Sequence, residues 1–314
     1  MHRTLSPAGA FWLAAFTYFI WGFTFLASRI AQDYGTPFVL LFWRFALAFA
    51  LLNLLRLTGR FPVRLRGRRP WPVLLAGLFE PVLYFPCEQY GLRLTSTSFS
   101  GVMVALIPLC SLIYGAVFLH EKATRQQVVF SVLSVAGVIV LAVYATGIGA
   151  GSFPGFLVLL GTVFAGAGYM VACRACSGSF TAFERTYITC GMGAAAFGVL
   201  SVLEHRHDLS AVVLPMTHAP FVLAIVFLSV VASVLSYLAL NRALEVLPVA
   251  RTAALINFST VVSVLAGVLL LHEPFGWVSA AASAAILVGI WGVQRFAAPA
   301  VPDTAESAEP LSPS

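Results

Sequence analysis

The chain has 314 residues, of which 60% are hydrophobic and 10% are charged, and it carries a formal net charge of +6 at pH 7. This composition leaves too little polar surface to cover one or two water-soluble domains of that total length. It therefore excludes an ordinary soluble protein and indicates that most of the chain lies in lipid.

Apolar segments long enough to cross a bilayer follow one another along the chain. A crossing helix needs about 20 mostly apolar residues, and by this measure the sequence predicts ten spans. The first five lie at residues 11–31, 37–57, 72–92, 98–118 and 126–146, and the last five at residues 153–174, 182–203, 220–240, 250–271 and 276–296. We therefore expect an all-α membrane protein with ten transmembrane helices.

Basic residues between the predicted spans indicate the orientation. Lys and Arg accumulate in cytoplasmic loops, and here they gather in alternate loops, above all in the cluster Arg56, Arg60, Arg64, Arg66, Arg68 and Arg69. This alternation predicts a multi-pass protein of the cell (inner) membrane with both termini in the cytoplasm. A cluster beside a membrane is better explained by anionic lipid than by nucleic acid. We therefore expect membrane lipid, and no nucleic acid, as a partner.

The two sets of five spans are related by an internal repeat. A shift of about 152 positions lays Leu119-His120-Glu121 on Leu271-His272-Glu273 without a gap. The same shift aligns Leu92 with Leu244, Ser111 with Ser263, Gly115 with Gly267 and Gly137 with Gly289. Because each set has an odd number of spans, the second set enters the membrane with the opposite orientation. Inverted halves can open a site between them to either side in turn, as in many secondary transporters.

Several short motifs in these repeats carry a family resemblance. They are Trp21-Gly22, Trp43-Arg44-Phe45, the run from Tyr90 through Pro108 to His120-Glu121, Leu240-Asn241-Arg242-Ala243-Leu244 and Leu271-His272-Glu273-Pro274. In these motifs the chain resembles the EamA-type transporters of the drug/metabolite transporter superfamily. The resemblance implies ten helices in two EamA repeats, in a carrier of the bacterial inner membrane. Many such carriers export amino acids and other metabolites.

The predicted spans divide the chain into four parts. We expect a cytoplasmic N-terminus at residues 1–10, a first EamA-like repeat at 11–146 and a second at 153–296. Residues 297–314, which are rich in Ala, Pro, Ser and Glu, are expected to form a disordered cytoplasmic tail.

The third predicted span carries acidic residues inside the membrane. Glu80 lies roughly 12 Å from the inner boundary, near the midplane, and Glu88 lies about two turns further along. With Tyr84 between them they share one helix face, while Pro81 and Pro86 interrupt the helix. Broken helices at the midplane are typical of binding sites. We expect these three residues to bind substrate, with Glu80 and Glu88 as proton carriers; alternatively, the glutamates only pair with a cation in a packed, kinked helix.

Arg44 is the cation that the sequence offers for such a pair. It lies about 10 Å inside the second span, where a planar guanidinium can bind a substrate carboxylate. The competing interpretation is a salt bridge between Arg44 and Glu88.

Aromatic and amide side chains complete the predicted substrate site. Trp21 in the first span and Tyr169 in the sixth are expected to stack on a ligand. Tyr237, Asn241 and Asn257 are expected to offer hydrogen bonds from the second half. The alternative for all five is packing between helices, which is the commoner role of aromatic stripes and neutral polar groups.

The paired motifs His120-Glu121 and His272-Glu273 lie where the fourth and ninth spans end. A carboxylate there is expected to cap the helix that follows. Neither loop offers enough ligands for a metal, and the chain has no phosphate-binding or hydrolase motif. We therefore expect no metal, no cofactor and no enzymatic activity.

These observations predict a secondary transporter, and specifically an exporter, of a small metabolite such as an amino acid or related polar compound. It would work by alternating access, with proton coupling as a further hypothesis. One alternative is an intramembrane lipid-modifying enzyme that uses Glu80 or Glu88 as general acid or base, which would need a nucleophile or metal that the sequence does not supply. The other is a non-transporting membrane sensor, which would need a signalling domain. The oligomeric state is left open.

Overall fold

The computed structural model describes residues 6–63, 68–107, 109–110, 113–114, 124–147, 153–176, 179–244 and 256–296. Over these residues the chain forms helices joined by loops, and no β-strand. A chain in lipid must satisfy its backbone groups internally, which a helix does within a single segment. The predicted all-α class is confirmed.

The helices follow the predicted spans in chain order. The first repeat contains α1 (Pro7–Gly22), α2 (Thr24–Gln32), α3 (Pro37–Leu57), α4 (Trp71–Gly77), η1 (Leu78–Leu83), α5 (Tyr84–Leu94), α6 (Thr97–Val104) and α8 (Arg125–Gly147). The second contains α9 (Phe153–Cys176), α10 (Ala182–Glu204), α11 (Ser210–Val213), η2 (Leu214–Thr217), α12 (Ala219–Val226), η3 (Phe227–Leu235), α13 (Ser236–Leu244), α15 (Ile256–Leu270) and α16 (Trp277–Arg295). The assignment of domain bounds at 11–146 and 153–296 stays a prediction.

Two local features differ from the expected spans. The first span is divided at Phe23, where the Thr24 hydroxyl donates to the Trp21 carbonyl at 2.6 Å. Between α10 and α12, where the sequence predicts no span, the chain forms the short helices α11 and η2. The second span, by contrast, runs over residues 37–57 as predicted, because Pro37 stands in the first turn, where its missing N–H is harmless.

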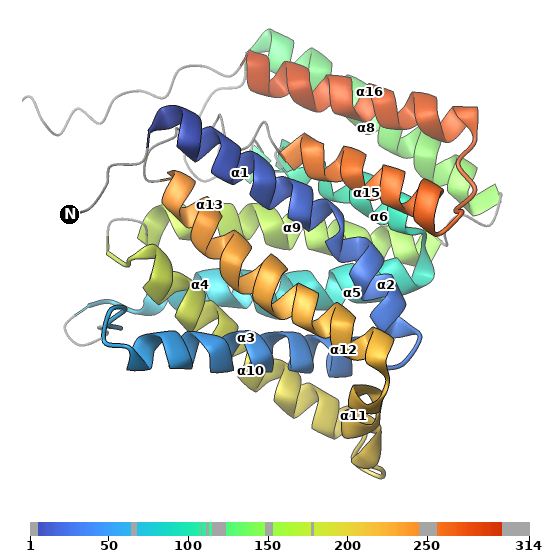
Figure 1. Ribbon diagram of the computed structural model, residues 1–314. Helices are drawn as coiled ribbons and strands as arrows, with labels where there is room; N and C mark the ends of the chain where they lie inside the picture. Colours follow the sequence, from blue (N-terminus) through green and yellow to red (C-terminus); the bar gives the residue numbers. More distant parts are fainter. Residues whose placement is uncertain are drawn as a thin grey trace, which may run out of the picture.

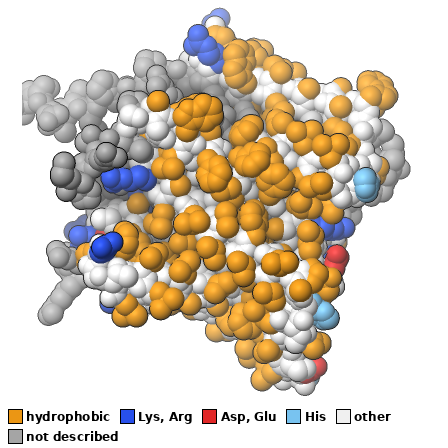
Figure 2. Space-filling view, in the orientation of Figure 1, with side chains coloured by type: hydrophobic (Ala, Val, Ile, Leu, Met, Phe, Trp, Pro, Cys, Tyr) orange, Lys and Arg blue, Asp and Glu red, His pale blue; other side chains and the backbone are white. Residues whose placement is uncertain are grey.

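The outer surface of the bundle is apolar. Among the described residues, four helices are long and apolar enough to cross a membrane: Ala8–Gln32, Pro37–Leu57, Ala182–Glu204 and Ala219–Leu240. Large side chains such as Trp12 and Leu223, each 70% exposed, face outward. Figure 2 shows apolar side chains across most of one face, with charged and histidine side chains toward its edges. Such a surface fits lipid rather than water.

The two repeats pack against each other through equivalent helices. Figure 1 shows α8 beside α16 at one edge of the bundle and α3 beside α10 near the opposite edge. The fourth and ninth spans, represented by α6 and α15, also pack together. In addition α1 contacts α13 and α15 of the second repeat, and α9 contacts α4, α5 and α6 of the first. Each repeat thus completes the core of the other.

Two glycines related by the repeat let α8 and α16 approach closely. A Cβ atom on Gly137 would lie 2.8 Å from the Ala282 carbonyl oxygen, and one on Gly289 would lie 2.7 Å from the Phe130 carbonyl oxygen. Small residues at helix contacts are a common means of association in lipid. The sequence identity between Gly137 and Gly289 therefore reflects a shared packing requirement.

The third and eighth spans both contain a π-helical segment. A shift of 152 positions lays η1 on residues 230–235, which lie inside η3. In η1, Pro81 lacks an N–H, and Glu80 has a non-helical backbone (φ −141°, ψ 113°). The expected break at Pro81 is therefore observed. Pro86 is not a second break as predicted, because it lies in the first turn of α5, where its missing N–H is tolerated.

The π segment η3 has no proline, so the sequence did not predict it. Here the hydroxyl of Ser236 donates to the carbonyl of Val231 at 2.8 Å. The same carbonyl also accepts from the backbone N–H of Ser236, so the hydroxyl adds a second hydrogen bond at the end of the π segment. Interrupted helices thus occur at equivalent places in both repeats, although different residues stabilise them.

Glu273 caps a helix, but a different one from that predicted. Its carboxylate accepts hydrogen bonds from the Thr97 amide at 2.6 Å, the Ser98 amide at 2.9 Å and the Ser98 hydroxyl at 2.8 Å. These amides begin α6 in the other repeat, whereas the expected partner was the following helix, α16. The inverted packing of α6 against α15 causes this, since it brings the start of one helix to the end of the other. Its repeat partner Glu121 lies outside the described residues.

One residue of the basic cluster, Arg68, also joins the two repeats, near the start of α10. Arg68 forms an ion pair with Glu184 at 3.0 Å and donates to the Ser179 carbonyl at 2.9 Å. Glu184 is buried, and with Thr181 it forms the capping box of α10. At least this arginine therefore has a protein partner besides any lipid, whereas Arg64 and Arg66 lie outside the described residues.

Replacement of Glu273 by Gln is expected to lower the free energy of unfolding by about 1–3 kcal/mol. An amide retains one acceptor but turns its NH2 group toward a helix N-terminus, so a charge-assisted hydrogen bond is lost. Thermal or detergent denaturation of the purified protein measures this. Asp33→Asn, at an exposed acid just after α2, is the control, and equal stability of both variants would contradict the capping role.

Substitution of Gly137 or Gly289 by Ala is expected to lower the free energy of unfolding by about 1–3 kcal/mol, because the new methyl group meets a backbone oxygen that cannot move freely. Gly198→Ala is the matched control, since its Cβ would lie 3.3 Å from the Phe42 ring, which can shift. Denaturation midpoints are compared, and a loss in Gly198→Ala as large as in the other two would refute the close-approach explanation.

Candidate functional site

A pocket lies between the two repeats, beside the break in the third span. It is lined by Phe45, Glu80, Pro81, Phe85, Tyr169, Thr189, Cys190 and Tyr237. The first four belong to α3, η1 and α5 of the first repeat, and the other four to α9, α10 and α13 of the second. Three of the predicted site residues, Glu80, Tyr169 and Tyr237, thus lie together.

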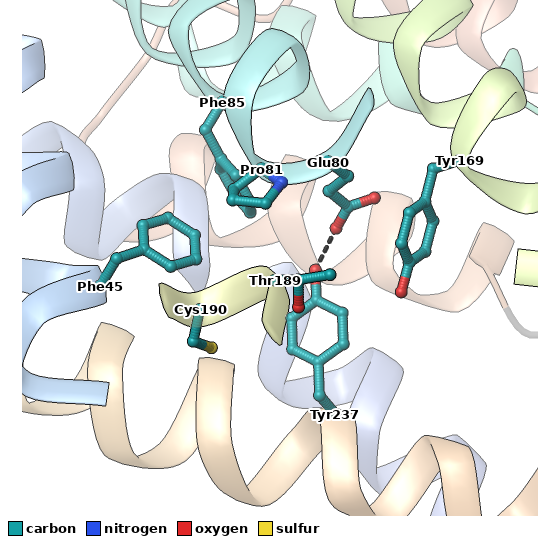
Figure 3. Close-up of a pocket in the computed structure, with 8 residues that line it drawn as sticks. All are labelled: Phe45, Glu80, Pro81, Phe85, Tyr169, Thr189, Cys190 and Tyr237. Atoms are coloured by element: carbon teal, nitrogen blue, oxygen red, sulfur yellow. Dashed lines mark hydrogen bonds between the residues drawn. The ribbon is translucent and has the colours of Figure 1, made fainter. Parts of the chain in front are cut away.

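Glu80 is the charged group of this pocket. Its backbone leaves helical geometry at the π segment, so that its side chain points away from the helix toward the second repeat. The hydroxyl of Tyr237 donates a hydrogen bond to Glu80 Oε1, and Tyr169 stands on the other side of the carboxyl group (Figure 3). One hydrogen bond at the pocket therefore connects the two repeats.

Trp21 supports the pocket from behind. Its ring centre lies 5.1 Å from that of Tyr237, and its indole N–H donates to the carbonyl of Ala232 at 2.9 Å. Ala232 is the repeat counterpart of Glu80 and lies in η3. The indole N–H of Trp21 thus bonds to the backbone of the π segment η3. Trp21 itself is not among the described residues that line the pocket.

Arg44 is buried, with 2% of its surface exposed. Its Nε donates to the Ser233 hydroxyl at 3.1 Å, and its guanidinium carbon lies 4.3 Å from the centre of the Phe85 ring. Within the described part of the chain, Nη1 has no hydrogen-bond partner, and Arg44 has no ion pair within 4.0 Å. The predicted salt bridge to Glu88 is therefore not formed, because the guanidinium packs on the aromatic ring instead.

Glu88 belongs to a buried polar network beside α2. It is 5% exposed, accepts a hydrogen bond from Gln89 Nε2 at 2.9 Å and interacts with Tyr84. Gln89 Nε2 also contacts the Ser28 hydroxyl at 3.2 Å. Glu80, Tyr84 and Glu88 interact with one another, but of the three only Glu80 is among the described residues that line the pocket.

The side chains of the remaining predicted site residues, Asn241 and Asn257, lie outside the described part of the structure. The sequence reading missed Phe45, Phe85, Thr189 and Cys190 as pocket residues. For Phe85 a signal existed, since it is the repeat counterpart of Tyr237. Thr189 and Cys190 carry no comparable signal, because only the tertiary packing of α10 brings them to the pocket.

The pocket combines one carboxylate with aromatic rings and hydroxyl groups. Aromatic faces attract cations, and a carboxylate accepts hydrogen bonds from an ammonium or amide group. Among the described residues no group of three or more His, Cys, Asp or Glu side chains is placed to hold a metal ion. The cavity itself is small, about 10 Å³, which is the space of one water molecule, so these groups can reach a small molecule with hydrogen-bond donors only when the surrounding helices move apart.

Known proteins resemble this chain over most of its length. The model of the EamA-like transporter family matches residues 8–143 and 153–295. Uncharacterized transporter YcxC of Bacillus subtilis (strain 168) is 32% identical over 285 residues, which cover 90% of this chain and 91% of the relative. An uncharacterized transporter of Archaeoglobus fulgidus is 27% identical, with 90% and 97% of the two chains covered.

A solved structure shows the same fold. A crystal structure of another protein matches with a TM-score of 0.65 and 20% identity, over 93% of this chain and 99% of the other. This likeness concerns the fold alone. The match to the family model, however, covers most of both repeats. The chain therefore belongs to the EamA-like transporter family, within the drug/metabolite transporter superfamily, and is a multi-pass membrane transporter.

Proposed function

We propose that this protein is a secondary transporter that exports a small metabolite, such as an amino acid or a related polar compound, in exchange for protons. The observation that carries the proposal is the cross-repeat hydrogen bond from Tyr237 to Glu80 in a pocket lined by both repeats. A ligand that takes this place on Glu80 changes the contact between the repeats. Binding and conformational change are then linked at one carboxylate.

The inverted repeats supply the mechanical part of the proposal. Inverted halves that can exchange conformations open a central site alternately to either side. Both halves carry a π segment at the equivalent place, and π-helical turns inside α-helices frequently occur at functional sites. The pocket adjoins η1, so movement there reaches the bound ligand directly.

Glu80 and Glu88 are the proposed proton carriers. Both lie in a membrane span, where a carboxylate without a cation within ion-pair distance is unfavourable in its charged form. Among the described residues neither carboxylate has such a cation. Glu80 faces the pocket and would release its proton when substrate binds there. Glu88 lies in the adjoining network and would affect how readily Glu80 releases that proton.

Replacement of Glu80 by Gln is expected to reduce pH-gradient-driven flux at least tenfold, because the amide cannot take up or release a proton. A thermal-shift screen against amino acids, nucleosides, amines and organic acids first identifies a ligand, since a ligand of the folded state raises its apparent stability. Flux of that ligand is then measured in liposomes with an imposed pH gradient.

Glu88→Gln is expected to slow the same flux less than Glu80→Gln does. Asp208→Asn, far from the pocket in an exposed loop, serves as the control and should behave as wild type. If Glu80→Gln and Glu88→Gln both leave gradient-driven flux unchanged, the proton role is refuted.

The orientation is proposed from the basic residues, with both termini in the cytoplasm of a bacterial inner membrane. A fluorescent protein fused after residue 296 should fold and fluoresce, while alkaline phosphatase at the same position should be inactive. Phosphatase inserted after Arg206, in a loop on the opposite side, should be active. The reverse pattern would contradict the proposed orientation.

A further inference from the structure

The fourth and ninth spans meet along a polar contact that ends at the Glu273 cap. We propose that the contact between α6 and α15 is where the carrier opens to one side of the membrane, and that Glu273 is the latch that holds it closed. By the proposed orientation this is the outer side, where α6 begins and α15 ends. The inference rests on the proposed function and adds to it a moving part outside the pocket.

The chain is shaped so that the Glu273 carboxylate reaches across to α6. His272 has a positive φ of 54°, and the Glu273 amide donates to the Gly267 carbonyl at 3.1 Å, so the chain turns back over the end of α15. A Cβ atom on Gly267 would overlap the Glu273 carboxylate and would lie 2.5 Å from Ser98 Oγ. Glycine at this position therefore leaves the room that the carboxylate needs to bind the first amides of α6.

The residues of this latch belong to a motif that the pocket does not use. A shift of 152 positions lays Gly115 on Gly267 and His120-Glu121 on His272-Glu273, although the residues of the first repeat lie outside the described part of the chain. Gly267, His272 and Glu273 are not among the described residues that line the pocket. A latch in the second repeat gives these three residues a role.

Beyond the latch, hydroxyl groups line the contact between α6 and α15. Ser263 donates to the Thr97 carbonyl at 3.4 Å, and Thr260 donates to the Gly101 carbonyl at 3.2 Å. Water can replace such bonds, because water-mediated hydrogen bonds are nearly as favourable as direct ones. The Thr97 hydroxyl is fully buried and has no hydrogen-bond partner within the described part of the chain, which is unfavourable until water reaches it. Parting of α6 and α15 therefore exposes groups that water binds well.

The other contacts between equivalent helices are of a different kind. The helices α3 and α10 pack through aromatic rings, such as Phe45 and Phe197, whose centres lie 5.6 Å apart. The helices α8 and α16 approach closely at Gly137 and Gly289. Separation of either pair would lose close packing or bring apolar surface into water, both of which are unfavourable. We therefore expect opening to part α6 from α15 and to leave these two pairs together.

Close packing connects α15 to the pocket. A Cβ atom on Gly22 of α1 would lie only 2.5 Å from the Val262 Cβ of α15. The neighbouring Trp21 ring lies 5.1 Å from the ring of Tyr237, whose hydroxyl bonds to Glu80. Closely packed groups have little room to move independently. A ligand that displaces Tyr237 from Glu80 thus acts on α15 through α1.

Cysteine labelling at two matched serines tests the proposal. Ser263→Cys reports on the α6–α15 contact and Ser134→Cys on the α8–α16 contact. Both serines are fully buried, and each donates to a backbone carbonyl of the other repeat, Ser263 to Thr97 at 3.4 Å and Ser134 to Ile286 at 3.3 Å. Purified full-length protein is treated with a hydrophilic maleimide, and the labelled peptides are quantified by mass spectrometry. Protein without an added cysteine gives the background from the five native cysteines, and thermal melting verifies that each variant is folded.

Removal of the latch should expose one reporter and not the other. Glu273→Gln should raise the labelling rate of Ser263→Cys at least tenfold and change that of Ser134→Cys less than twofold, because the charge-assisted bonds to α6 are lost. An equal rise at both reporters would show general loosening of the bundle, and no rise at either would show that the contact stays closed without the acid. Either result overturns the proposal.

A milder variant keeps the test decisive if Glu273→Gln does not fold. Ser98→Ala removes only the hydroxyl bond to Glu273, which is 2.8 Å long, and leaves both amide bonds in place. It should raise the labelling rate of Ser263→Cys at least threefold and leave that of Ser134→Cys within twofold. The same two contrary results overturn the proposal.

Flux in liposomes separates the latch from the proposed function. Glu273→Gln should move the ligand found by the thermal-shift screen at least threefold more slowly than wild type, because a carrier biased toward one open state completes fewer cycles. Flux of Glu273→Gln equal to that of wild type overturns the latch and leaves a transporter in place. Selective exposure of Ser263→Cys without flux for any ligand class supports the latch and overturns the proposed function.

Discussion

The structure depends on one constraint: lipid offers the backbone no hydrogen-bond partner. Regular helices meet this constraint within themselves, so any interrupted helix needs protein groups to replace what it loses. In the eighth span the Ala232 carbonyl accepts from the indole N–H of Trp21, and the Val231 carbonyl accepts from the Ser236 hydroxyl in addition to the Ser236 backbone N–H. The third span breaks at Glu80 and Pro81, beside a pocket lined by both repeats. The break in the helix and the buried polar side chains occur at the same place, because both need surroundings that are shielded from lipid.

Each half of the inverted repeat contains an interrupted helix, and different side chains surround the interruption in the two halves. Positions 80 and 232 are equivalent, yet one is an acid that faces the pocket and the other an alanine whose carbonyl binds Trp21. Positions 85 and 237 are also equivalent, and only the second carries a hydroxyl, which bonds to Glu80. The duplicated scaffold thus fixes where helices break, whereas single substitutions in one copy decide which chemistry is placed there. The charge of the site resides in the first repeat and its hydrogen-bond donor in the second.

What the sequence could predict follows from how local each feature is. The span at residues 37–57 was predictable because one apolar run begins at a proline and contains no interruption. The break at Pro81 was predictable from the missing N–H, but the π segment η3 was not, since no residue in it is unable to continue a helix. Glu80 and Tyr237 were predicted from their polar groups inside apolar spans and Tyr169 as a ring that stacks on a ligand, whereas Thr189 and Cys190 reach the pocket only through packing. The partner of Glu273 likewise depends on how α6 lies against α15, which no local pattern encodes.

Polar contacts between the repeats also lie near the ends of helices, where Arg68 pairs with Glu184 in the first turn of α10 and Glu273 accepts from the first amides of α6. A hydrogen bond to a charged group contributes about 1.5–3 kcal/mol net. A ligand with a dissociation constant between about 1 mM and 1 μM gains about 4–8 kcal/mol on binding. The two quantities are comparable, so a ligand compensates for the loss of one such contact only if most of its binding free energy is available in one conformation and not in the other. Contacts much stronger than these would hold one conformation permanently, and much weaker ones would leave the pocket open to both sides at once.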